Sequence, residues 1–270
     1  MTWQPDKSSL QVMGILNVTP DSFSDGGQYR FLNAALQRVE EMLMEGVDII
    51  DIGGESTRPG APAVSAQEEL DRVIPVIEAI RQRFAVPLSI DTSKPIVMRE
   101  AVKAGADLLN DVRALQEEGA LQVCAELDVP ICLMHMQGLP RTMQLEPHYT
   151  NVVNEVYGFF EQRIQACEAV GIARDRLILD PGFGFGKNLD HNIDLLRRLK
   201  AFSALNLPLL VGLSRKSMLG KLLGERPVED RLHASIAAAV IAAMQGATII
   251  RVHDVKATND ALKIVKAIIH

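Results

Sequence analysis

Residues 47–52 read VDIIDI, and this short stretch decides the fold class. Its apolar residues fall on successive positions instead of alternate ones, which is typical of a strand that is buried on both faces. The runs LILD (177–180) and LLVGL (209–213) have the same character. Because doubly buried strands belong mainly to parallel sheets covered by helices, the stretch predicts an α/β protein.

Outward from this stretch, short apolar runs alternate with longer amphipathic runs along the whole chain. We predict eight strands, at residues 12–17, 47–52, 87–91, 107–110, 130–135, 177–180, 208–213 and 249–252. Eight strand–helix repeats predict a (β/α)8 TIM barrel, and we expect one domain over residues 1–270. The runner-up is a doubly wound open sheet, but the dinucleotide fingerprint of that fold is absent after the first strand.

The helices between the strands carry recognisable boundary signals. Ser65 and Glu68 form a capping box, and Pro75 predicts a kink or break farther along that helix. Ser93 is a candidate cap for the next helix, which we expect to end at Gly105. We predict two further helices at 151–169 and 231–245, and a last helix with a buried face made of Ala261, Leu262, Ile264, Val265 and Ile268.

The composition excludes several functional classes. The net charge is -6 and no basic run stands out, so we expect no nucleic-acid partner. Three cysteines without a CxxC pattern favour buried thiols in a reducing compartment. We see no signal peptide and no apolar run long enough to cross a membrane, and therefore expect a cytoplasmic protein.

Polar residues follow nearly every predicted strand. In barrels of this kind the chemistry lies at the carboxyl ends of the strands. A single polar residue of this kind is readily explained as a helix cap or a structural residue. A ring of them at the open end of the barrel, here called the mouth, predicts a binding or catalytic site. The residues are Asn17, Asp51, Glu55, Asp91, Asn110, His135, Asp180, Lys216, Arg251 and His253.

The loop DPGFGFGKN (180–188) invites comparison with phosphate-binding loops. It fails the Walker pattern, because Pro181 replaces the first glycine and Asn188 the final hydroxyl residue. Lys187 breaks the dinucleotide pattern. An aspartate beside two phenylalanines, which we expect to be exposed, favours a flat nitrogen-rich heterocycle. The Asp180 carboxylate would accept a pair of N–H bonds from such a ring.

The remaining mouth residues extend this interpretation. Asp91 and Asn110 would add acceptors and donors, Lys216 would donate to a ring carbonyl, and Arg251 would stack on a ring face. An anion site is also implied: Arg58 and His253, with Ser22 or Thr57, suit a diphosphate. Asn17 would help to hold Mg²⁺, or it simply braces its loop.

Eight motifs together resemble the bacterial dihydropteroate synthases. The resemblance covers nearly the whole chain in order, without a departure at a motif position. The motifs are MGILNVTPDSFSDGG (13–27), DIGGESTRPG (51–60), SIDTSKP (89–95), LLNDVRAL (108–115), LMHMQG (133–138), LDPGFGFGKN (179–188), VGLSRKSMLG (211–220) and RVHD (251–254).

The resemblance implies a homodimeric, Mg²⁺-dependent transferase of folate biosynthesis, from the class of enzymes that sulfonamides target. Such enzymes join 6-hydroxymethyl-7,8-dihydropterin diphosphate to p-aminobenzoate. The resemblance places Asp91, Asn110, Met134, Asp180, Phe185, Lys216 and Arg251 at the pterin. It places Asn17, Arg58, Arg251 and His253 at the diphosphate, with Asn17 also at the metal, and Thr57, Pro59, Arg215 and Ser217 at p-aminobenzoate.

The chemistry that we expect is an SN1-like loss of diphosphate. The catalytic residues would be Asp25, Arg58, Asp91 and Lys216, with Asp25 and Asp91 favouring the cation that forms. Two alternatives are a pterin-binding methyltransferase barrel and a pterin-binding paralogue without catalysis. The Ser-Thr-Arg-Pro context argues against the first, and the presence of Asn17, Arg58 and His253 argues against the second.

Overall fold

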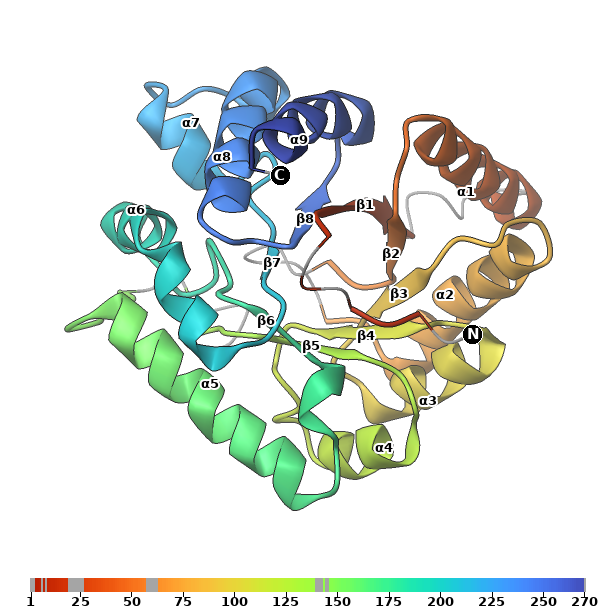
Figure 1. Ribbon diagram of the computed structural model, residues 1–270. Coiled ribbons are helices and arrows are strands. Elements are labelled where there is room, and N and C mark those ends of the chain that lie inside the picture. Colours follow the sequence, from red (N-terminus) through yellow and green to blue (C-terminus); the bar gives the residue numbers. More distant parts are fainter. Residues whose placement is uncertain are drawn as a thin grey trace.

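The computed structural model forms a barrel of parallel strands surrounded by helices (Figure 1). It describes residues 3–5, 7, 9–18, 27–56, 63–138, 143 and 146–269. The eight strands follow the order β6-β5-β4-β3-β2-β1-β8-β7. A parallel bridge between Leu179 and Leu209 joins the two ends of this sheet, so the barrel is closed. The (β/α)8 prediction is therefore confirmed, and the open-sheet alternative is wrong.

All eight predicted strands are present, with small shifts at their ends. The strands are β1 (Gln11–Asn17), β2 (Ile49–Gly53), β3 (Leu88–Asp91), β4 (Leu108–Asp111), β5 (Ile131–Met134), β6 (Leu177–Asp180), β7 (Leu210–Val211) and β8 (Ile249–Val252). The helices are α1 (Gly27–Met44), α2 (Ala66–Arg81), α3 (Pro95–Ala104), α4 (Ala120–Glu126), α5 (Val152–Ala169), α6 (Leu189–Arg197), α7 (Ser217–Leu222), α8 (Leu232–Met244) and α9 (Val255–Ile269). No helix in these described ranges has the length and apolar character needed to cross a membrane.

Side chains fill the barrel interior below the mouth. Seven of the strands each contribute one buried apolar residue to a separate cluster, against which Trp3 packs from the N-terminal segment. The members are Met13, Ile49, Leu108, Cys132, Ile178, Leu210 and Ile249. A second, larger apolar layer lies between the sheet and the helices. This double burial explains why the strands read as continuous apolar runs.

The strand register brings polar residues into one row at the mouth. Asn17 pairs with Gly53, Gly53 with Asp91, and Asp91 with Asn110 across four neighbouring strands. On the other side of the barrel, Met134 pairs with Asp180. Residues from six strands that are distant in the sequence therefore face one opening.

Several helix predictions are confirmed. Ser65 accepts the Glu68 N–H in a capping box, and Gly105 ends α3 with a left-handed φ of 119°. Asn151 caps α5 through its side chain. The C-cap of α8 is Gln245, one residue before Gly246, whose φ is 99°.

Other helix predictions are corrected. The predicted break at Pro75 is absent, because α2 continues through it with Val73, Val76 and Ile77 buried in the core on both sides of the proline. The cap of α3 is Lys94, because the Ser93 side chain hydrogen-bonds to the Asp111 side chain instead. On α9, Leu262 and Val265 are buried as expected, whereas Ile264 and Ile268 are 63% and 74% exposed.

Candidate active site

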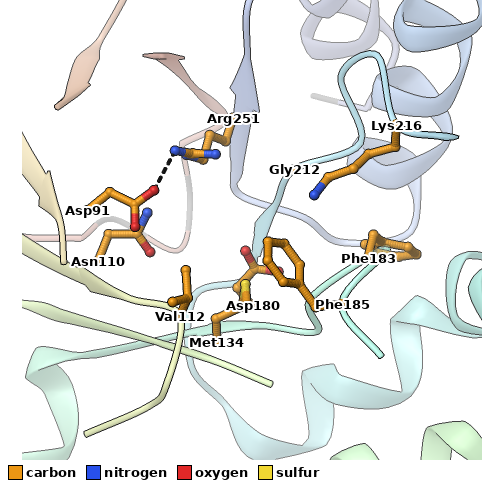
Figure 2. Close-up of a pocket in the computed structure, with 10 residues that line it drawn as sticks. All are labelled: Asp91, Asn110, Val112, Met134, Asp180, Phe183, Phe185, Gly212, Lys216 and Arg251. Carbon is orange, nitrogen blue, oxygen red and sulfur yellow. Dashed lines mark hydrogen bonds and ion pairs between the residues drawn. The ribbon is translucent and has the colours of Figure 1, made fainter. Parts of the chain in front are cut away.

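One pocket opens at the carboxyl ends of the strands (Figure 2). Its empty volume is about 350 Å³, including the part that is open to solvent. Seven of the residues predicted from the sequence line it: Asp91, Asn110, Met134, Asp180, Phe185, Lys216 and Arg251. Val112, Phe183 and Gly212 complete the lining. The sequence analysis noted Phe183 only as a ring beside Asp180 and did not single out Val112 or Gly212.

Arg251 links two carboxylates on one side of the pocket. Its Nε donates to Asp51 Oδ2 at 2.6 Å, and its Nη2 donates to Asp91 Oδ2 at 2.8 Å. Asp51 Oδ2 also accepts a 3.2 Å bond from Asn110 Nδ2. Asp51 is fully buried and does not line the pocket. It acts from below as the common support of Asn110 and Arg251.

Burial shapes the protonation of this cluster. Burial raises the pKa of Asp91 to about 7, although the charge of Arg251 opposes the shift. Burial alone would lower the pKa of Arg251, but the carboxylates of Asp51 and Asp91 outweigh it and raise that pKa. The two results agree physically, because Arg251 divides its charge between two buried carboxylates and therefore cannot fully offset the desolvation of Asp91.

Asp180 lies on the opposite wall, at the end of β6. Its Oδ1 accepts the backbone N–H of Gly182 at 2.8 Å, and burial raises the pKa of its carboxyl. The expectation that the two phenylalanines of the following loop are exposed is wrong. Phe183 is 1% and Phe185 9% exposed, because both rings pack inward as part of the pocket wall.

Lys216 closes the pocket from the β7 side. Its Nζ lies 4.2 Å from the centroid of the Phe185 ring, a cation–π contact. Burial, followed by the charge of Arg251, lowers the pKa of Lys216 to about 8. The pocket thus combines carboxylates, an amide and two cations with the apolar side chains of Val112, Met134, Phe183 and Phe185. Such a set of donors and acceptors suits the edge and faces of a nitrogen heterocycle.

Other predicted site residues lie around the mouth but do not line the pocket. His253 Nδ1 lies 3.0 Å from Ser214 Oγ. Arg215 makes two hydrogen bonds to the Asp254 carboxylate, at 3.0 and 2.6 Å. Ser217 is exposed at the start of α7. The predicted residues Asp25, Thr57, Arg58 and Pro59, together with Ser22, lie outside the described residues.

His135 and Glu55 are corrections to the predicted ring of mouth residues. Side chains alternate along a strand, so Met134 points into the barrel and the next residue, His135, points outward. The His135 ring packs edge-on against Phe159 of α5, with 4.8 Å between ring centroids. Glu55 turns away from the pocket and binds Lys94.

A divalent cation would find oxygen ligands beside this pocket. A Cβ on Gly53 would lie 3.9 Å from both Asn17 Oδ1 and Asp91 Oδ2, so both oxygens lie near this glycine. Asp91 Oδ2 also accepts a bond from Arg251. A neutral amide oxygen and a carboxylate are suitable Mg²⁺ ligands when phosphate oxygens and water complete the shell. The described residues contain no group of three or more His, Cys, Asp or Glu side chains placed to hold a metal unaided.

Comparisons with known proteins point in the same direction. Residues 13–253 match the family model described as pterin binding enzyme. The dihydropteroate synthase of Escherichia coli strain K12 is 60% identical over 262 residues, which cover 97% of this chain and 93% of that protein.

Two solved structures share the fold across nearly the whole chain. The Yersinia pestis dihydropteroate synthase, solved in complex with a sulfonamide drug, is 59% identical with a TM-score of 0.93, covering 98% of this chain and 96% of that one. The Xanthomonas albilineans enzyme with 4-aminobenzoic acid is 52% identical with a TM-score of 0.91, covering 97% and 94%.

Proposed function

The chain belongs to the pterin-binding enzymes and, within them, to the dihydropteroate synthases, and from this premise we propose the reaction that its site performs. The protein transfers the pterinylmethyl group of 6-hydroxymethyl-7,8-dihydropterin diphosphate to the amine of p-aminobenzoate. The products are 7,8-dihydropteroate and diphosphate. The observation that carries the proposal is one pocket that joins Asp180, Asn110, Lys216 and Arg251.

The pterin ring fits this pocket edge by edge. The Asp180 carboxylate accepts the pair of N–H groups at the amino-pyrimidinone edge of the ring, and the anchored Gly182 N–H keeps the carboxylate in place. Asn110 binds the pterin ring beside Asp180, and Lys216 donates to the ring carbonyl. Arg251 stacks over the ring face, and Met134 and Phe185 supply apolar contacts.

The bond that breaks joins the exocyclic methylene carbon to a diphosphate oxygen, and the electron pair leaves with diphosphate. The pterin ring delocalises the positive charge that develops at the methylene. The ionised carboxylates of Asp91 and Asp25 favour that charge, while Arg58, Arg251 and His253 stabilise the charge on the leaving group. The arylamine of p-aminobenzoate then forms the new C–N bond and releases a proton to solvent.

Two further groups complete the proposed site. Asn17 would hold Mg²⁺ together with the diphosphate, and the metal would neutralise charge on the leaving group. p-Aminobenzoate would lie at Thr57, Pro59, Arg215 and Ser217. The bidentate Asp254 partner fixes the Arg215 guanidinium in one orientation. Sulfonamides resemble p-aminobenzoate and would compete at this subsite.

A dissociative path and a concerted path differ in whether the bond to diphosphate breaks before the arylamine attacks the methylene carbon. We expect positional isotope exchange within the diphosphate before the arylamine attacks. Complete inversion at a labelled methylene, with no exchange, would instead establish concerted displacement.

The proposal includes the assembly and the compartment. We propose a homodimer, supported by the exposed apolar residues Ile241, Met244, Ile264 and Ile268 on the adjacent helices α8 and α9. The three cysteines are free and buried, which suits a reducing compartment such as the cytoplasm.

One assay tests the function. Purified protein is mixed with Mg²⁺, the dihydropterin diphosphate and labelled p-aminobenzoate, and the products are separated. Labelled dihydropteroate that disappears when EDTA is added supports both the reaction and the metal requirement. Absence of product while the pterin still binds in calorimetry would favour the methyltransferase or the non-catalytic alternative.

A further inference from the structure

A buried lysine lies just behind the pocket and takes no part in the proposed reaction. Lys187 is 2% exposed and does not line the pocket. Its Nζ donates to the carbonyl oxygens of Gly182 and Phe185, each at 2.9 Å, and to that of His135 at 3.4 Å. It also lies 2.9 Å from His135 Nδ1, which accepts when the imidazole carries its proton on Nε2.

The loop of residues 180–188, called the glycine loop from here on, therefore wraps around this ammonium group. Gly182 and Phe185 belong to the loop itself, whereas His135 belongs to the segment after β5, so Lys187 ties two neighbouring strand ends together. The approach is close: a Cβ on Gly182 would lie 1.9 Å from the His135 carbonyl oxygen, and one on Gly186 would lie 2.3 Å from that of Gln137. Glycine is required at both positions for steric reasons, besides their left-handed φ values of 68° and 61°.

The same loop positions two groups of the pocket. Lys187 binds the carbonyl of Phe185, whose ring supports the ammonium of Lys216. Lys187 also binds the carbonyl of Gly182, whose N–H holds the Asp180 carboxylate. A shift of the loop backbone would therefore move the Phe185 ring and the Asp180 carboxylate together.

We propose that Lys187 is a positioning residue for pterin recognition: its ammonium fixes the glycine loop so that Asp180 and Phe185 face the ring. This inference rests on the proposed function, because it assigns the pocket to a pterin. It adds a residue whose side chain touches no substrate.

The hydrogen bonds around Lys187 explain how a cation can be held at this buried position, although burial makes it easier to deprotonate. Burial lowers the pKa of Lys187 to about 7, whereas the charge of Asp180 opposes this shift. Burial and the charge of Lys187 hold the pKa of His135 well below its usual value, which keeps the imidazole neutral and able to accept. A buried cation is costly unless it is hydrogen-bonded, and here neutral acceptors surround it on several sides.

The test replaces the charge and keeps the bulk. Lys187→Met removes the ammonium group and keeps a side chain of similar volume. Lys187→Gln retains a shorter polar group and replaces the methionine variant in the test if that variant does not fold. The matched control is Arg176→Met. Arg176 is likewise a cation surrounded by main-chain carbonyls, those of Cys124, Leu127 and Val129. It precedes the first residue of β6 and thus lies at the opposite end of that strand from the pocket.

Three quantities are measured for each variant: the KM values of both substrates, kcat, and pterin affinity by calorimetry. We expect Lys187→Met to raise the KM for the pterin diphosphate and the pterin Kd by roughly tenfold or more, the size of effect associated with lost hydrogen bonds from a charged group. The KM for p-aminobenzoate should change much less. Arg176→Met should lower the melting temperature and leave the pterin Kd unchanged.

The possible results test the positioning role of Lys187 separately from the proposed enzymatic function. A folded Lys187 variant with the wild-type pterin Kd overturns the positioning role, whatever its melting temperature. Equal losses of pterin affinity in the Lys187 and Arg176 variants also overturn it, since the effect would then follow general stability. A wild-type protein that binds no pterin would instead refute the proposed function.

Discussion

Arg251 is the residue that couples the polar side chains on one side of the pocket. It binds Asp51 and Asp91 at the same time, while Asp51 also accepts from Asn110. A guanidinium suits this task because its N–H groups point in fixed, separate directions. The side chain is therefore held in one plane before any ring arrives, which lowers the entropic cost of stacking on a ligand.

We predict that Asp180→Asn abolishes most pterin binding. The amide would present a donor where the pterin ring also presents donors, so the site loses an acceptor pair and gains a repulsive contact. The expected cost is about 1.5–3 kcal/mol or more, a roughly 10- to 150-fold rise in Kd by calorimetry. The matched control is Asp190→Asn, the same change at an exposed position in the first turn of α6. Unaltered affinity in the Asp180 variant would refute the assigned role.

We predict that removing Asp51 damages the site from below. Asp51→Ala leaves Arg251 with one carboxylate and Asn110 without its acceptor. Breaking a buried pair by deleting one partner costs about 3–5 kcal/mol, and the remaining bond to Asp91 should keep the loss near the lower value. Urea denaturation should show this drop in the free energy of unfolding, accompanied by a lower kcat/KM for the pterin substrate. A drop in stability with unchanged kcat/KM would contradict the supporting role in the site.

The pKa shifts of Asp91 and Lys216 predict how activity depends on pH. Asp91 must be ionised to favour the cation, and its pKa is raised to about 7. Lys216 must be protonated to donate, and its pKa is lowered to about 8. The pH profile of kcat/KM should therefore rise as Asp91 ionises near pH 7 and fall as Lys187, whose pKa is also lowered to about 7, and then Lys216 lose their protons. Lys216→Met should remove the part of the alkaline limb near pH 8 from the residual activity, and an unchanged limb near pH 8 would assign that part to another group.

We predict that the free energy of unfolding changes with pH in the opposite direction to activity. Because the folded pKa of Asp91 lies above the ordinary 3.8, the folded protein retains a proton that the unfolded chain releases, and the free energy of unfolding falls as pH rises from about 4 to 7. The folded pKa of Lys216 lies below the ordinary 10.5, so its contribution to stability rises between about pH 8 and 10.5. These groups together place a stability minimum where activity is highest.

At the residue scale, the sequence predicted the pocket walls but not their supports. Asp91, Asn110, Asp180, Lys216 and Arg251 could be assigned because each follows an apolar run. The supporting role of Asp51 could not, since the sequence does not show that Arg251 reaches back across the sheet. The internal position of Lys187 also has no sequence signal, because a lysine beside glycines is typical of an exposed loop.

The glycine loop is the element on which the pocket depends most, and we predict a strong position effect within it. Gly182→Ala combines a left-handed φ with a clash against main chain, so the loop must move. Gly119 is the matched control: its φ is 82°, yet an added Cβ meets nothing within 4 Å. Gly119→Ala should cost only the strain, about 1–2 kcal/mol, and keep pterin affinity. Similar pterin Kd values for the two alanine variants would refute the importance of the clash.

The element boundaries show which signals the sequence carries and which it lacks. Strand positions followed from local apolar runs, whose double burial leaves a clear pattern. Ser93 was misassigned because its hydroxyl has a competing partner, Asp111, on the neighbouring strand. Ile264 and Ile268 were misassigned because periodicity alone does not distinguish a face buried in the core from an apolar face that reaches the surface.

That exposed apolar face raises the question of assembly at the scale of the whole molecule. Ile241 and Met244 are spaced three residues apart on α8, and Ile264 and Ile268 four apart on α9, so each pair lies on one side of its helix. Their exposed fractions are 46%, 64%, 63% and 74%. The two helices contact each other, and Figure 1 shows them side by side on the outside of the barrel. Apolar side chains at such density favour a protein interface.

We predict that this face holds two copies together. Analytical ultracentrifugation of the wild-type protein should give about twice the chain mass of 29.6 kDa. The double variant Met244→Glu with Ile268→Glu should sediment as a monomer, because burying carboxylates without partners opposes association. Met44→Glu is the matched control, since Met44 is 77% exposed at the end of α1, on a different helix. It should remain dimeric. A monomeric wild-type protein would refute the dimer, and a double variant that stays dimeric would move the interface to another face of the barrel.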